Sequence, residues 1–132
     1  MSGLTLNDQF AIQSLMHAYA TAADTRDQAL LADCFVESAT AEYGDLGKWA
    51  CRADIVSGLG GMLASCGPTL HYVSNIVAWA EGKGAVVRCY THAVVHVPGL
   101  DQPVRTAGIY DDELVRDGDA WRIASRRYTA VA

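Results

Sequence analysis

Apolar residues recur at helical spacing in the first half of the chain and predict three helices. A helix start at Thr5-Leu6-Asn7-Asp8 begins the first helix, which we expect to run from about Asn7 to Ala23. Asp27 can cap the second helix, and Gly67-Pro68 ends the third. The apolar positions are Ile12, Leu15, Met16, Tyr19 and Ala23 in the first helix, Leu30, Leu31, Cys34 and Phe35 in the second, and Ile55, Leu59, Met62 and Leu63 in the third.

From Thr69 onward the pattern is typical of β-strands separated by the turn segments "EGKG", "PGLDQP" and "RDGD". The segment "ATAEYGDLGKWA" (39–50) predicts a short strand through Tyr43, a glycine turn and a second short strand near Trp49. Helices followed by a long antiparallel meander indicate an α+β fold, in which helices gather on one face of a curved sheet and enclose a cavity. The four long strands are expected at about 69–80, 85–97, 103–115 and 120–129.

The composition limits the number of domains and the kinds of binding partner that we expect. A chain of 132 residues with 51% hydrophobic content suits a single domain, 1–132, with one core. A net charge of −5 argues against nucleic acid and favours a neutral or apolar small molecule. Residues 1–20 lack a signal-peptide pattern and no stretch has the ~20 apolar residues that span a bilayer, so we expect a cytoplasmic protein without a membrane partner. The four cysteines form no C-x-x-C pair, and we expect them to be reduced core residues.

Two polar residues stand on an otherwise apolar strand face. In a regular strand His71 and Asn75 point to one side together with Val73, Val77 and Trp79, so His71 needs a hydrogen-bonding partner opposite it. Asp24 is the candidate, because it closes the first helix where the helix dipole disfavours an anion. The alternatives are a core histidine held by a backbone carbonyl, and an Asx-turn at Asp24 that leads into the second helix.

Other polar side chains support fewer kinds of chemistry. His92 and His96 share a strand face about 13 Å apart, which is too far for one metal ion, so we expect no metal site. Tyr19 and Tyr43 are core aromatics that could donate a proton if they face a cavity. Arg126 and Arg127 lie on opposite faces of the last strand, so at most one points inward. The sequence has no phosphate loop, serine elbow or cysteine nucleophile.

The segments "YATAADTRDQALLADCF", "LHYVSN" and "AGIYDDELVRDGDAWRIASRR" together resemble the SnoaL-like branch of the nuclear transport factor 2-like superfamily. The resemblance covers nearly the whole chain and implies a cone-shaped barrel, in which a curved, mainly antiparallel sheet wraps around N-terminal helices. Dehydrochlorinases and dehydratases of this group use an Asp–His pair that matches Asp24 and His71. The same resemblance implies that Arg126 attracts a departing anion and that Tyr43 assists. Isomerases of the fold carry an aspartate base where Tyr43 stands.

These observations and the resemblance together indicate a cofactor-independent lyase, of dehydratase or dehydrohalogenase type, for a small cyclic or polyketide-like substrate. His71 is the expected general base, with Asp24, Tyr43 and Arg126 as the other catalytic residues. Tyr19, Asn75, His96 and Tyr110 are the expected substrate-binding residues. A polyketide cyclase or isomerase with the same pocket, or a non-catalytic ligand-binding protein, is the alternative. We also expect a homo-oligomer, a trimer or dimer, formed through an apolar outward face of Leu70, Tyr72, Ile76 and Ala78.

Overall fold

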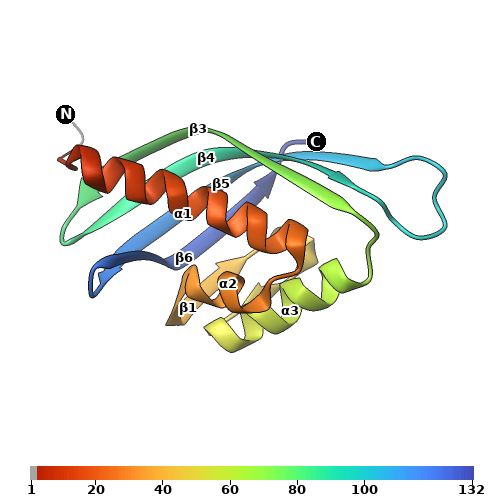
Figure 1. Ribbon diagram of the computed structural model, residues 1–132, viewed down its shortest axis with the longest axis horizontal. Coiled ribbons are helices and arrows are strands. Elements are labelled where there is room, and N and C mark those ends of the chain that lie inside the picture. The colour runs from red at the N-terminus through yellow and green to blue at the C-terminus, as the bar shows by residue number, and fades with distance from the viewer. Residues whose placement is uncertain (1–2) are drawn as a thin grey trace.

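The computed structural model describes residues 3–132 and has an α+β fold, as the sequence predicts (Figure 1). No helix in this part of the chain is long and apolar enough to cross a membrane. In chain order the elements are α1 (Leu6–Thr25), α2 (Gln28–Asp33), β1 (Phe35–Glu42), a 3-10 turn η1 (Gly44–Leu46), β2 (Lys48–Trp49), α3 (Arg52–Ala64), β3 (Thr69–Glu81), β4 (Gly84–Val95), β5 (Val104–Asp117) and β6 (Ala120–Ala130).

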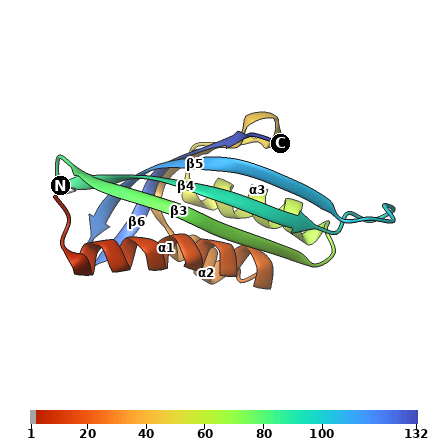
Figure 2. The ribbon, with the colours of Figure 1, turned by 90° about the horizontal axis from the view of Figure 1, so that it is seen from above.

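The strands form one curved sheet in the order β2-β1-β6-β5-β4-β3. Strands β3 to β6 make the expected antiparallel meander, and β1 joins its far side in parallel with β6. The sheet stays open between its edge strands β2 and β3. Helix α1 packs along β3 and α3 packs on β1, so the helices and the inward side of the sheet face each other across the core (Figures 1 and 2).

Helix α1 begins where its capping residues predict. The Thr5 side chain accepts a hydrogen bond from the backbone of Asp8, and the Asp8 side chain accepts one from the backbone of Thr5. This reciprocal arrangement satisfies two backbone donors that the first turn of a helix leaves unpaired. The apolar stripe predicted for the helix is buried. The helix continues to Thr25 and ends at Arg26, which has a left-handed backbone with φ 59°.

The second helix is shorter than predicted. Asp27 caps it as expected, but the helix ends at Asp33, and Phe35 is the first residue of β1. Cys34 and Phe35 are therefore not part of a helical stripe, although both are buried. The reason is tertiary: the carbonyl of Cys34 accepts a hydrogen bond from the amide of Ile123 in β6, which starts the parallel pairing of β1 with β6.

A β-bulge in β3 corrects the predicted strand face. Asn75 has a left-handed backbone with φ 53°, and the pairing with β4 shifts between Ser74 and Val77. An extra residue in a strand exchanges the two faces beyond it. Consequently Val77 and Trp79 lie on the outer side, 58% and 43% exposed, and do not share the face of His71. The inward side chains beyond the bulge are Ile76, Ala78 and Ala80, so Ile76 and Ala78 do not belong to an outward apolar face.

The cysteines divide into two kinds. All four are free thiols, as expected, but only Cys34 and Cys89 are buried in the core. Cys51 and Cys66 are partly exposed, so the prediction of four core residues is wrong for these two. Burial raises the pKa of the Cys34 thiol to about 11 and that of the Cys89 thiol to about 12.

Candidate active site

A cavity of about 410 Å³ lies between the helices and the inward face of the sheet. Leu59, Met62 and Leu63 of α3 form one wall, and inward residues of β4 and β5 form another. None of the described residues that line it is Asp, Glu, Lys or Arg. Its polar groups are mainly hydroxyls and one imidazole, that of His71. Such a lining suits a neutral, largely apolar ligand.

Asp24 and His71 form the hydrogen-bonded pair that the sequence analysis predicts. His71 Nδ1 lies 2.6 Å from Asp24 Oδ1, and the His71 amide donates to Asp24 Oδ2 at 2.8 Å. Their side chains are 16% and 17% exposed. A carboxylate can only accept hydrogen bonds, so the imidazole must donate from Nδ1. In the neutral ring Nε2 is then the acceptor, and His71 lines the cavity.

The positions of the two residues follow from local structure. Asp24 lies in the last turn of α1, at the negative end of the helix dipole. Thr69 starts β3 beside this helix end, and its hydroxyl donates to Asp24 Oδ1 at 2.9 Å. Three donors from the start of β3 therefore offset the unfavourable location of the carboxylate.

Four of the described tyrosines line the cavity. Three of them, Tyr19, Tyr43 and Tyr110, are buried and are called the cavity tyrosines below, and the fourth is Tyr128. The hydroxyls of Tyr19 and Tyr43 are 2.5 Å apart, and the Tyr110 ring packs edge-on against Tyr19 at 5.7 Å. Burial raises the pKa of each of the three, and the nearby charge of Arg126 opposes that rise. Their hydroxyls therefore stay protonated at neutral pH. One hydroxyl of the Tyr19–Tyr43 pair donates to the other, which leaves the second proton of the pair for a ligand oxygen.

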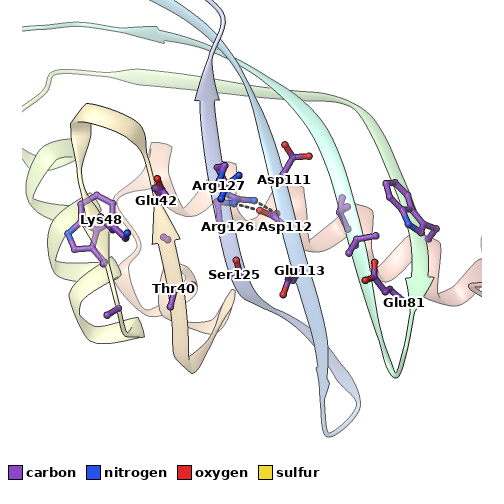
Figure 3. A pocket seen from close by; sticks show the side chains of 16 residues that line it. Thr40, Glu42, Lys48, Glu81, Asp111, Asp112, Glu113, Ser125, Arg126 and Arg127 are labelled. Carbon is purple, nitrogen blue, oxygen red and sulfur yellow. Dashed lines mark hydrogen bonds and ion pairs between the residues drawn. The ribbon is translucent and has the colours of Figure 1, made fainter.

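Arg126 lies behind these tyrosines and is paired with Asp112. Its Nε and Nη2 donate to the two Asp112 oxygens at 2.8 and 2.7 Å, between the neighbouring strands β6 and β5 (Figure 3). Both side chains have no exposed surface. The guanidinium stacks 3.8 Å from the centre of the Tyr110 ring and 4.2 Å from that of Tyr19. Burial alone would lower the pKa of Arg126, but the Asp112 carboxylate and the nearby Tyr43 and Tyr110 together outweigh it and hold the pKa well above the ordinary value.

The sequence matches the SnoaL-like domain over residues 4–127. The chain belongs to the SnoaL-like family. No curated protein matches it. Among solved structures, a proposed scytalone dehydratase from Novosphingobium aromaticivorans is 23% identical, with a TM-score of 0.89 over 96% of this chain and 86% of its own.

Two further solved structures are similar to the SnoaL-like chain. A type 2 hexachlorocyclohexane dehydrochlorinase is 17% identical, with a TM-score of 0.89 over 96% of this chain and 87% of its own. A proposed aromatic ring hydroxylase from Novosphingobium aromaticivorans is 28% identical, with a TM-score of 0.87 over 98% and 92%. These proteins share one fold, but their names refer to different reactions. The function of this chain must therefore be argued from its site.

Two predicted substrate-binding residues of the SnoaL-like chain lie outside the cavity. Asn75 is exposed because it forms the bulge in β3. His96 is exposed beyond the end of β4, where its backbone pairs with Gly67 and Pro68. The inward residues of β4 alternate as Thr91, Ala93 and Val95, which turns His96 away. The predicted placement of both residues is therefore wrong, whereas Tyr19 and Tyr110 line the cavity.

The sequence analysis missed three residues of the site. Thr69 could have been found, because it lies two positions before His71 and so on the same strand face. The same rule places Asp112 on the inward face with Tyr110, but its position opposite Arg126 depends on the register of β5 and β6. Arg127 is exposed and Arg126 buried, as the alternation predicts. Arg26 gives no sequence signal, because its contacts with Gly67 and Thr69 depend on how α1 meets β3.

Proposed function

We propose that the chain is a cofactor-independent lyase that removes a proton and a β leaving group, water or halide, from a small cyclic or polyketide-like substrate. The observation that carries the proposal is the Asp24–His71 pair, because a neutral imidazole with Nδ1 bound to a carboxylate is a general base with its free nitrogen available. The apolar cavity around His71 suits an uncharged ring.

The proposed reaction begins when His71 Nε2 removes a proton from the carbon beside a substrate carbonyl. Asp24 stabilises the imidazolium that forms. Of the hydrogen-bonded hydroxyls of Tyr19 and Tyr43, one donates to the other, and that other donates its own proton to the developing oxyanion. The electrons of the C–H bond form the new double bond as the bond to the leaving group breaks. When hydroxide leaves, the imidazolium returns the proton and water is released. When halide leaves, the proton passes to solvent.

We assign Arg126 an indirect part in this reaction. The resemblance implies that Arg126 meets the departing anion, but Tyr19 and Tyr110 cover its guanidinium and Asp112 occupies its Nε and Nη2. Its charge favours the oxyanion through the tyrosines, since it opposes the rise of their pKa values. Because no free cation lines the described cavity, an isomerase or cyclase that forms the same enolate without losing a group is the second candidate.

The test uses panels of cyclic β-hydroxy and β-halo ketones in deuterated water, with mass spectrometry as the readout. A lyase lowers the substrate mass by that of water or hydrogen halide, while an isomerase keeps the skeleton and exchanges the α-hydrogen. His71→Gln keeps size and polarity and should lower turnover on the order of 10²-fold or more. Near-normal turnover by folded His71→Gln protein would exclude this mechanism. Binding without deuterium exchange or mass change would favour a ligand-binding protein.

A further inference from the structure

Arg26 has an unusual backbone and an unusual set of partners. It follows α1 with φ 59°, a left-handed conformation that residues with a Cβ atom rarely adopt. Its guanidinium holds the end of α1 against the start of β3. Nη1 donates to the Ala23 carbonyl at 2.7 Å and to Thr69 Oγ1 at 2.8 Å, and Nη2 donates to the Gly67 carbonyl at 2.7 Å. Left-handed non-glycine residues persist where surrounding contacts hold them, often beside functional sites.

These contacts fix the direction of a hydroxyl hydrogen. A guanidinium has no acceptor, so in its contact with Arg26 the Thr69 hydroxyl must accept. Its single proton is then left for Asp24 Oδ1, 2.9 Å away. Thr69 is only 5% exposed, so solvent offers little competition for that proton. Arg26 thereby makes Thr69 a donor to the same carboxylate oxygen that faces His71 Nδ1.

We propose that Arg26 and Thr69 are positioning residues for the Asp24–His71 pair. With the Thr69 hydroxyl on Oδ1 and the His71 amide on Oδ2, the carboxylate cannot rotate without breaking a hydrogen bond. His71 therefore meets one fixed oxygen, which holds its ring as the Nδ1–H tautomer and leaves Nε2 as the base. The inference rests on the proposed function, because it assigns these residues to the same proton transfer.

The decisive comparison is Thr69→Val against Thr69→Ser. Valine keeps the shape and removes the hydroxyl, whereas serine keeps it. Thr25→Val is the matched control, because within residues 3–132 the Thr25 hydroxyl, at the same helix end, bonds only to the Thr21 carbonyl. Nitrogen-15 NMR of the His71 ring reports the tautomer without any substrate. We expect wild type, Thr69→Ser and Thr25→Val to show the Nδ1–H tautomer with a slowly exchanging proton, and Thr69→Val to show faster exchange and a mixture of tautomers.

Turnover supplies the second readout. Thr69→Val should lower kcat roughly 10- to 100-fold with little change in KM, because it disturbs the orientation of the base and not the cavity wall. Arg26→Lys keeps the charge but loses the forked contacts, so it should shift both readouts in the same direction, and it tests the proposal if Thr69→Val does not fold. Unchanged His71 signals and turnover in folded Thr69→Val or Arg26→Lys would overturn the positioning role and leave the lyase proposal standing. Normal turnover in His71→Gln would reject the lyase proposal. Altered NMR signals in Thr69→Val would still support the positioning of the His71 ring by Thr69.

Discussion

The buried Asp112–Arg126 pair should be the most sensitive ionic contact of the fold. Asp112→Ala removes both oxygen acceptors of Arg126 and leaves the guanidinium charged in a site with no exposed surface. Its Nη1 already lacks a hydrogen-bond partner among the described residues, so the guanidinium would keep only the weak contact of Nη2 with the Met16 sulfur at 3.6 Å. Removal of one member of a buried pair costs about 3–5 kcal/mol, because the remaining charge is desolvated and uncompensated.

That cost is a large share of the total stability. A chain of 132 residues has a free energy of unfolding of roughly 7–20 kcal/mol. With a urea dependence of about 2 kcal/mol per molar, the loss corresponds to a midpoint about 2 M lower. Equilibrium urea unfolding followed by circular dichroism measures this shift, and an unchanged slope shows that the folded and unfolded states still differ by the same exposed surface.

The neighbouring residue provides a matched control. Asp111 on β5 also accepts two hydrogen bonds from one arginine, since Arg88 Nε and Nη2 bind it at 2.8 and 3.1 Å, but this pair is 40% and 57% exposed. Exposed pairs contribute little, so Asp111→Ala should move the midpoint far less. The double variant Asp112→Leu/Arg126→Met replaces the pair with apolar side chains and should recover most of the lost stability. Equal shifts for Asp112→Ala and Asp111→Ala, or a double variant less stable than Asp112→Ala, would refute this reasoning.

Three further predictions use other parts of the molecule. Burial raises the pKa of the cavity tyrosines, so the folded state holds their protons more tightly than the unfolded state. The stability that they contribute should be fully present below about pH 10 and be lost above it, with tyrosinate absorbance appearing together with unfolding. Cys34 and Cys89 have raised pKa values and are buried, so a thiol reagent should modify only the other two cysteines until urea unfolds the chain. We propose a dimer or trimer through the outer sheet face, where Tyr72, Val77 and Trp79 are exposed; light scattering should show an oligomer that Trp79→Glu dissociates, and only monomer in the wild type would contradict it.

The order of the elements could be predicted because its signals are local. Helix starts at Thr5 and Asp27 depend on side chains within three residues of the cap, and the meander depends on turns between alternating segments. The Asp24–His71 contact could also be inferred, because a polar side chain on an apolar face and an anion at the wrong end of a helix each require a partner. Two such requirements in one small domain are most simply met by each other.

Features that depend on strand register could not be predicted in this way. Phe35 continues a helical spacing, but the edge of β6 offers it a parallel partner, and the hydrogen bonds of that pairing outweigh one more turn of α2. Whether Arg126 meets a ligand or a carboxylate depends on which residue of β5 lies beside it, and the bulge between β5 and β6 shifts that register by one position. Local pattern therefore identifies the inward arginine, and only the assembled sheet identifies its partner.

The bulge at Asn75 gives the two ends of β3 different sets of inward side chains. Before the bulge, the inward positions hold Thr69 and His71, which reach the end of α1 and the cavity. Beyond it they hold Ile76 and two alanines, Ala78 and Ala80, and the carbonyl of Ala78 accepts a hydrogen bond from Gln9 of α1 at 3.3 Å. Without the shift the same face would present Trp79, whose indole would occupy the space that α1 fills. The exchange of faces therefore lets the N-terminal part of α1 pack closely on β3, while the C-terminal end of α1 places Asp24 beside His71. Asparagine suits this position because its short polar side chain tolerates the left-handed backbone.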